Sequence, residues 1–369
     1  MIPLVRPYFD EAEAKAVEET LKSGWVAGQG PRCRELEEKF SAYNGSKFAI
    51  TVNNCTAALH LSLLAHGVKK GDEVIVADYT YPATGHAVMY CGATPVFTDV
   101  DARTYNINPE EIKKNITEKT VGIIPVHTFG QPADMDPIME IAREKGLFVV
   151  EDAACAAGAE YKGKKAGSMG DVGCFSMHAR KNMSTGEGGL ITTDNEKLMG
   201  KMRSLSCFGI ESAHKRASGG FSVPMFTELG YNYKLSDIAA SIGIWQLAKL
   251  DTIITRRREL VKTYLAGLEG IKGITPPFES QDGKHIYQSF VCLVDKEVNR
   301  NEVITKLREN GVEAQIGTYS CHIQPVYNSS YKCPVSEDVF NRAIALPMYY
   351  GLKDSEVDYV IEKVGTVLE

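Results

Sequence analysis

The chain has 369 residues, of which 44% are hydrophobic and 24% charged, and its formal net charge is −6. This composition is typical of a soluble globular protein with one large and one smaller domain, and it argues against disorder. The negative charge gives no basic field for nucleic acid, and no apolar stretch reaches the about 20 residues that a membrane span needs. Nine cysteines without Cys-x-x-Cys spacing indicate reduced thiols in a cytoplasmic protein, with neither a disulfide framework nor a metal site.

Apolar runs typical of strands alternate with helical patterns over the first part of the chain. We expect strands at 48–52, 73–76, 94–97, 121–126 and 147–150, and helices at 56–66, 84–90 and 136–145. Such alternation predicts an α/β fold with a mainly parallel sheet that helices cover on both faces.

The second part of the chain begins with a long amphipathic pattern. It predicts a helix over 236–268, followed by a strand at 288–294 and helices at 300–310 and 355–367. We therefore divide the chain into a large α/β domain, 1–250, and a small α+β domain, 251–369. The segment 211–227 shows no periodicity, and we expect a long mobile loop that covers a site or a partner subunit.

The segment 173–189 contains the most informative pattern of the chain. It places Lys181 after Ser176 and His178 and before the glycine-rich run 186–189, which leads into the apolar run 190–193. A lysine amine forms a Schiff base with an aldehyde cofactor, and small neighbours let a cofactor approach the backbone. Because a solvated lysine is protonated at neutral pH, we expect burial or nearby positive charge, from Arg180 or the cofactor, to lower the pKa of Lys181.

A carboxylate, Asp152, ends the apolar strand that lies upstream of Lys181. A carboxylate against a pyridinium nitrogen, together with a Schiff-base lysine, is the usual protein contribution to pyridoxal phosphate (PLP) chemistry. We therefore predict a PLP enzyme whose catalytic residues are Lys181 and Asp152. Asp152 would keep the ring nitrogen protonated, and Lys181 would also carry a proton between substrate and cofactor carbons. A helix N-cap is the alternative role for Asp152 alone.

Further cofactor contacts are predicted around the first strand–helix junction. Thr56 and Ala57 begin a helix, and their backbone N–H groups with the Thr56 hydroxyl form a candidate phosphate site, although helix capping explains the pattern equally well. Ser176 is a second candidate phosphate ligand. Tyr81 is placed to stack on a flat ring, and packing in the core is its alternative.

With these residues in place, the chain resembles the DegT–StrS family of sugar aminotransferases, which are fold-type-I PLP enzymes. The resemblance covers nearly the whole chain, and its motifs are specific only in combination. They are Ser23–Val26 with Gly28 and Gly30, Cys55–Leu59, Thr80–Tyr81, Pro125–His127 with Gly130–Pro132, Glu151–Ala154, Ser176–Lys181, Gly186–Gly189, Gly230–Asp237 and Leu346–Pro347.

The resemblance implies a seven-stranded-type sheet, a smaller C-terminal domain and a homodimer with active sites at the subunit interface. It places at the cofactor Thr56, Ala57, Tyr81, Asp152, Cys155, Ser176, Lys181 and, from the second subunit, Asn232. It implies substrate contacts for Trp25, His178, Glu187 and His322.

The same resemblance implies the reaction. L-glutamate would be the amino donor, and a nucleotide-linked keto-sugar would be the acceptor. The amino group would pass through a Lys181 internal aldimine and pyridoxamine phosphate. Similarity to perosamine-synthase-like members favours a 4-keto-6-deoxy sugar. The alternatives are a 3-keto-sugar or cyclitol aminotransferase, and a non-catalytic PLP-binding regulatory protein.

Three positions depart from the family pattern. Cys155 stands where Gln or His is usual, and a thiol is a weak hydrogen-bond partner for the phenolic oxygen of the cofactor. Cys55 replaces Gly or another small residue, and Lys234 replaces an Arg, so bidentate recognition of a carboxylate or phosphate is in doubt there. None of these changes removes a predicted catalytic group.

Overall fold

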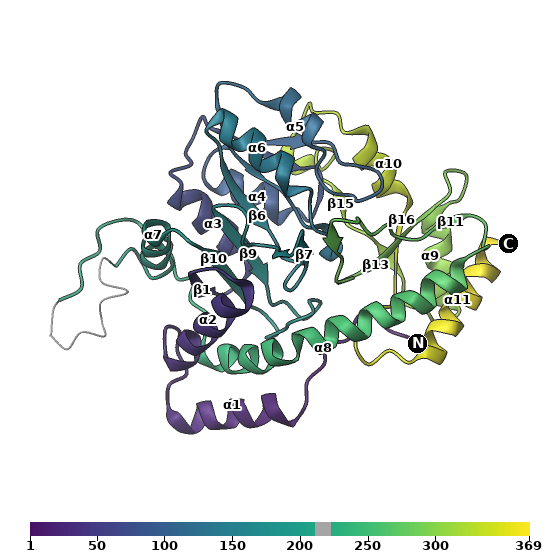
Figure 1. The fold of residues 1–369 in the computed structure, drawn as a ribbon, viewed down its shortest axis with the longest axis horizontal. Coiled ribbons are helices and arrows are strands. Elements are labelled where there is room, and N and C mark those ends of the chain that lie inside the picture. The colour runs from purple at the N-terminus through teal and green to yellow at the C-terminus, as the bar shows by residue number, and fades with distance from the viewer. Residues whose placement is uncertain (211–222) are drawn as a thin grey trace.

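The computed structural model describes residues 1–210 and 223–369, which form an α/β protein with one large and one smaller sheet (Figure 1). The large sheet has seven strands in the order β1 (Phe48–Val52), β10 (Gly189–Thr193), β9 (Val172–Ser176), β6 (Phe148–Asp152), β5 (Thr120–Ile124), β2 (Glu73–Ala77) and β4 (Thr94–Thr98). Neighbours from β9 to β4 are parallel, and β10 is antiparallel to the strands on both its sides. The prediction of a mainly parallel, seven-stranded sheet is confirmed.

Helices cover both faces of the large sheet, because side chains of a strand point alternately to opposite faces. Val74 and Val76 pack in a core with helices of one face, whereas Ile75 and Ala77 pack in a core with helices of the other. The first face carries α3 (Cys55–Ala65), α4 (Ala83–Tyr90) and α7 (Glu196–Ser206). The second carries α2 (Pro31–Asn44), α5 (Pro109–Asn115), α6 (Met135–Lys145) and the first half of α8 (Asp237–Leu268).

Helix α8 connects the two parts of the molecule and begins as the sequence predicts. The Ser236 side chain caps its first turn by accepting from the Ala239 N–H. Residues up to Ile254 pack in the core of the large sheet, and residues from Leu260 pack in the core of the smaller one. Figure 1 shows the helix passing beneath both sheets. The division at residue 250 therefore falls inside a continuous helix, and we retain it as a proposal.

The smaller sheet has the strand order β11 (Ile274–Thr275), β13 (Phe290–Val294), β16 (Ala343–Leu346) and β14 (Gln315–Ile316). It packs with α9 (Arg300–Glu309) and α11 (Asp354–Leu368). Ile2 pairs with Val312, so the start of the chain lies on this part too. Both termini are therefore found near the smaller sheet in Figure 1.

Two short sheets tie the parts together. One joins β12 (Gly283–Lys284), β7 (Glu160–Tyr161) and β8 (Lys164–Lys165), and the other pairs β15 (Tyr319–Ser320) with β3 (Tyr79–Thr80). The β15–β3 pair brings a C-terminal segment against the residues that follow β2. The remaining elements are α1 (Glu11–Ser23), α10 (Pro334–Arg342) and short 3-10 turns at Thr128–Gly130 and Pro325–Tyr327.

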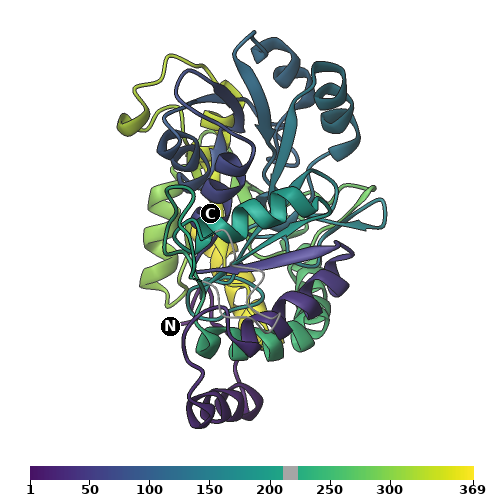
Figure 2. The same ribbon diagram turned by 90° about the vertical axis from the view of Figure 1, so that its left-hand side faces the viewer.

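The sequence patterns did not predict the strands β9 and β16, the helices α1, α2, α5, α7 and α10, or the short strands. Figure 2 shows α1 standing below the rest of the molecule, alongside one end of α8. Most of the loop expected over 211–227 lies outside the described residues. None of the described helices is both long and apolar enough to cross a membrane.

Candidate active site

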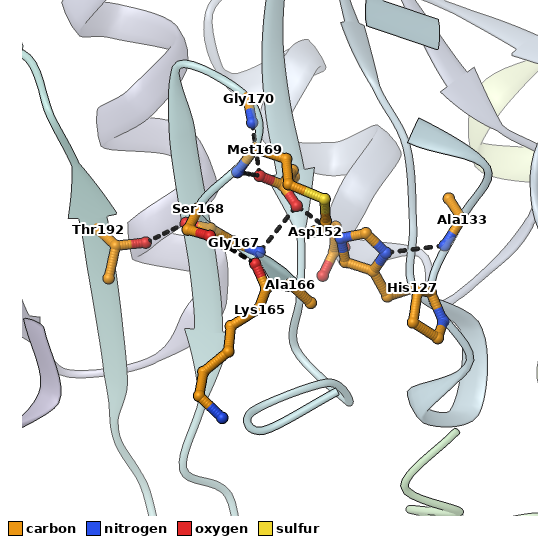
Figure 3. A network of polar contacts seen from close by, with 12 residues as sticks. His127, Ala133, Asp152, Lys165, Ala166, Gly167, Ser168, Met169, Gly170 and Thr192 are labelled. Atoms are coloured by element: carbon orange, nitrogen blue, oxygen red, sulfur yellow. Dashed lines mark hydrogen bonds and ion pairs between the residues drawn. The ribbon is translucent and has the colours of Figure 1, made fainter. Parts of the chain in front are cut away.

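The carboxyl end of β6 is anchored by Glu151, which is fully buried. Its carboxylate accepts hydrogen bonds from three backbone N–H groups of the turn 167–170, at 2.6 to 2.7 Å, and from His127 Nε2 at 2.9 Å. The other ring nitrogen of His127 accepts from the Ala133 N–H, so the ring proton is on Nε2. Figure 3 shows His127 between Ala133 and this turn. Four donors therefore fix the residue that precedes Asp152.

Asp152 is the next residue of β6, and its side chain points to the opposite face. One carboxylate oxygen accepts from Thr84 Oγ1 at 2.8 Å, and the other accepts from the Ala154 N–H at 3.1 Å. Burial raises the pKa of Asp152, and these hydrogen bonds oppose the rise. No helix begins in the turns that follow, so the N-cap alternative is wrong. Within the described residues Asp152 has no ion-pair partner, and its oxygens keep lone pairs for a further donor.

Lys181 lies in the turn between β9 and β10, where its N–H donates to the His178 carbonyl. Its Nζ donates to Cys155 Sγ over 3.0 Å. Burial lowers the pKa of Lys181, but the thiols of Cys155 and Cys55, together with Asp152, raise it by more. The pKa of Lys181 therefore lies above the ordinary lysine value, and the prediction that its surroundings lower this pKa is wrong. Cys55 and Cys155, two of the departures from the family pattern, are part of the physical reason.

The N-terminus of α3 lies against the glycine-rich run, as a phosphate site there requires. A Cβ on Gly189 would come within 2.6 Å of the backbone of Asn54, so only glycine fits this contact. Asn54 Oδ1 accepts from the Ala57 N–H at 2.8 Å, which is the capping contact that the sequence left as an alternative. The N–H and hydroxyl of the half-buried Thr56 have no hydrogen-bond partner within the described part of the chain. Thr56 is therefore the better placed of the two predicted ligands.

Ser176 reaches the same place from β9. It lies opposite Gly189 in the strand register, and its Oγ accepts from the His178 N–H at 3.2 Å, which leaves the hydroxyl hydrogen available to an anion. The structure therefore brings together the predicted residues Thr56, Ser176, Lys181 and Asp152, at the carboxyl ends of β6 and β9 and the start of α3.

The other predicted residues lie further out. Tyr81 is 67% exposed and contacts the Tyr319 ring edge-on, so the core-packing alternative is wrong. Asn232 is exposed and contacts Lys234. Trp25 is 61% exposed, beyond the end of α1.

His178 and Glu187 face each other across the lysine turn, with 3.7 Å between the imidazole Nε2 and the carboxylate. His322 is buried and bound to Asp78, on the segment that follows β2. The structure therefore does not gather the four predicted substrate residues into one pocket of a single chain.

Three residues that the sequence patterns did not reveal also position this site. Thr84 binds the Asp152 carboxylate, and Gln288, from the C-terminal part, donates to the Arg180 carbonyl at 2.8 Å. Asp78 holds His322. No spacing in the sequence links these residues to their partners, because each contact joins segments at least 68 residues apart.

The residues present fit pyridoxal phosphate. A buried carboxylate with no ion-pair partner within the described residues suits a protonated ring nitrogen, a buried amine suits an aldehyde, and the amino end of α3 suits a phosphate. Lys181, Asp152, Thr56 and Ser176 would hold the group. A large mainly parallel sheet with a lysine and a carboxylate so arranged is the architecture of a PLP-dependent enzyme of fold type I.

Comparison with known proteins agrees. The sequence matches the DegT/DnrJ/EryC1/StrS aminotransferase family over residues 7–365, and the chain belongs to this family. It is 36% identical to GDP-perosamine synthase of Escherichia coli O157:H7, covering 99% of this chain and 98% of that protein. It is 38% identical to the spore coat polysaccharide biosynthesis protein SpsC of Bacillus subtilis, and the match covers 100% of this chain and 97% of that protein. The structure resembles the PLP form of the sugar aminotransferase Spr1654 of Streptococcus pneumoniae, with a TM-score of 0.93, 31% identity, and coverage of 100% of this chain and 98% of that one.

Proposed function

We propose that this enzyme transfers the amino group of L-glutamate to the ketone of a nucleotide-linked 4-keto-6-deoxy sugar. The observation that carries the proposal is the placement of the Lys181 amine and the buried Asp152 carboxylate at one end of the large sheet. The choice of a nucleotide sugar oxidised at position 4 rests on the similarity to GDP-perosamine synthases.

PLP supplies an aldehyde that exchanges amines and a ring that withdraws electrons from the substrate carbon. Asp152 holds a proton at the ring nitrogen, and Thr84 orients the carboxylate through its hydroxyl. Lys181 would be the amine that holds the aldehyde, and its free amine would move a proton at the substrate carbon. Thr56 and Ser176 would donate hydrogen bonds to the phosphate.

We also propose a homodimer in which each site receives residues from both subunits. Asn232, Trp25 and Tyr81 are exposed on a single chain, although the family resemblance places all three at the active site. A second subunit would cover these side chains. We assign the reaction to the cytoplasm, because nine free thiols suit a reducing compartment.

The test is the absorbance spectrum of the purified protein before and after L-glutamate. We expect a band near about 420 nm that converts to one near about 330 nm, and that returns when a nucleotide-linked 4-keto-6-deoxy sugar is added. Return with a 3-keto-sugar or cyclitol alone would replace the proposed acceptor. A 420 nm band that ignores glutamate would favour the non-catalytic PLP-binding alternative.

Two variants assign the chemistry to residues. Lys181→Ala should lose turnover and the visible band, whereas Lys197→Ala, on an exposed lysine, should keep both. Asp152→Asn should lose several orders of magnitude in rate and keep the fold, with the exposed Asp358→Asn as its control. A loss below tenfold, or about 1.4 kcal/mol of barrier, would assign the pyridinium contact to another residue.

A further inference from the structure

Asp78 forms a buried hydrogen-bond network with His322. Asp78 follows β2 and is fully buried. Its carboxylate accepts from the His322 N–H at 2.6 Å, from His322 Nδ1 at 2.8 Å and from Ser320 Oγ at 2.7 Å. The Ser336 hydroxyl, from α10, is a fourth donor. One aspartate therefore joins the end of β2 to two C-terminal segments.

Asp78, His322 and Cys333 lie close enough together to be considered as ligands of a metal ion. The hydrogen bonds argue against that role. A cation needs lone pairs directed at one point, whereas the Asp78 oxygens are already used by four N–H and O–H donors. The Cys333 thiol donates to the Phe97 carbonyl instead. The cluster is built to orient an imidazole ring.

The carboxylate fixes the tautomer of His322. A nitrogen lone pair at 2.8 Å from a carboxylate oxygen would repel it, so Nδ1 carries a hydrogen and donates to Asp78. The second nitrogen, Nε2, has no hydrogen-bond partner within the described residues. It is not fully buried, so it is accessible to solvent. His322 therefore presents a defined Nε2 outward, as an N–H donor when the ring is protonated and as a lone pair when it is neutral.

The charged groups that most affect the pKa of His322 are carboxylates. The hydrogen bond from Asp78 raises the pKa of His322, burial lowers it, and the more distant carboxylates of Glu337 and Asp99 raise it further. Asp78 comes from the end of β2, Glu337 from α10 and Asp99 from the end of β4. The balance keeps the ring protonated to higher pH than that of an ordinary histidine.

The network lies at the same edge of the large sheet as Asp152. Strands β2 and β6 flank β5 and all three are parallel, so their carboxyl ends lie about 10 Å apart. A short bonded chain also connects the two places. The Cys321 thiol donates to the Thr80 carbonyl, the Thr80 hydroxyl contacts that of Thr84, and Thr84 binds Asp152.

We propose that Asp78 is a positioning residue that holds His322 as a proton donor and acceptor for the carbonyl oxygen of the oxo substrates. The inference rests on the proposed transamination. When a ketone oxygen is replaced by an amine, the C–O bonds break, a C=N bond forms and the oxygen leaves as water. Overall, both hydrogens of that water molecule come from the amino group. His322 gives its Nε2 proton to the departing oxygen and regains one that the nitrogen releases.

The experiment uses the holoenzyme, first converted by L-glutamate, and follows its single-turnover reaction with 2-oxoglutarate at 330 and 420 nm across pH. In wild type the rate should fall as pH rises through the pKa of His322, because the donor is then lost. His322→Gln should abolish this alkaline limb and lower the rate at least tenfold. Asp78→Asn should move the limb to lower pH. Asp237→Asn, which changes an equally buried carboxylate bound to the Arg32 and Cys33 N–H groups, should leave the limb in place.

A ligand-independent measurement accompanies the kinetics. The imidazole titration of His322, followed by NMR in protein labelled with 13C at histidine and assigned with His322→Gln, should also move to lower pH in Asp78→Asn. An unchanged titration, or a limb that survives in His322→Gln, would overturn the inference. If Asp78→Asn does not fold, the inference is tested by whether His322→Gln abolishes the alkaline limb of the pH profile. A wild-type enzyme that ignores both glutamate and 2-oxoglutarate would instead reject the proposed function.

Discussion

The Lys181 amine lies 3.0 Å from the Cys155 thiol, so the nucleophile of the site is paired with a sulfur atom. Of the neighbours that raise the pKa of Lys181, Cys155 has the largest effect, ahead of Cys55 and Asp152. An amine attacks an aldehyde only in its neutral form. The thiol therefore affects how readily Lys181 captures the cofactor, in addition to any contact with the cofactor itself.

Cys155→Ala should lower the pKa of Lys181 and so move PLP capture to lower pH. Burial, which lowers this pKa, is left less opposed when the thiol is removed. Stopped-flow absorbance of the apoprotein mixed with PLP, repeated across pH, measures the midpoint of the capture rate. Cys91→Ala is the control, because this cysteine lies at the end of α4 and does not contribute to the pKa of Lys181. A midpoint that stays in place in Cys155→Ala would show that the sulfur contact has no influence on the amine.

Thr84→Val should move the acid limb of activity to higher pH. The Thr84 hydroxyl is the first of the contacts that oppose the rise in the Asp152 pKa, so its loss lets burial raise that pKa further. Asp152 must be ionised to hold the ring-nitrogen proton, and a higher pKa means that activity disappears sooner as pH falls. The pH dependence of kcat/KM measures the shift. Thr192→Val, at a buried threonine bonded to the Gly167 carbonyl, should leave the limb unchanged.

The sequence predicted those parts of the molecule in which a local pattern decides the structure. Short continuous apolar runs placed β1, β2, β4, β5 and β6 to within about two residues. The glycine-rich run predicted close packing beside Lys181, and the structure adds that Gly189 packs against the Asn54 backbone. Lys181 and Asp152 are predictable because a lysine beside a glycine-rich run and a carboxylate that ends an apolar strand are the usual protein contribution to PLP chemistry.

The sequence patterns failed where a contact between distant segments determines the structure of the site. No local pattern joins Thr84 to Asp152, Asp78 to His322, or the Cys155 thiol to the Lys181 amine, because each pair meets only once the sheet has formed. The pKa of Lys181 was predicted with the wrong sign for the same reason. Burial acts as expected, but the neighbours that outweigh it come from two other segments, the end of β6 and the start of α3.

Asn232 should act across the dimer interface. It is exposed on the single chain, although the family resemblance places it at the phosphate of a second subunit. Asn232→Ala should lower activity, and mixing inactive Lys181→Ala chains with Asn232→Ala chains should restore up to about a quarter of the wild-type sites, since only one of the two sites in a mixed dimer is intact. Activity of refolded mixtures, with each variant refolded alone as control, measures the recovery. No recovery would argue for sites built within one chain.

Glu151→Gln should destabilise the fold although it changes a single atom. The Glu151 carboxylate receives four N–H donors in a fully buried place, and an amide can accept on one atom only, so its NH2 group would face a donor. Hydrogen bonds to a charged group contribute about 1.5–3 kcal/mol each, and a broken buried contact costs more than its mean value.

We expect the free energy of unfolding of Glu151→Gln to fall by at least about 3 kcal/mol in urea, against no change in the exposed Glu118→Gln. Because the Asp152 N–H and carbonyl bind the Pro125–His127 segment, loosening this end of β6 should also weaken PLP binding. A stable Glu151→Gln variant that binds PLP as wild type does would show that Asp152 is held by its own contacts, with Thr84 and the Ala154 N–H, and does not depend on the residue before it.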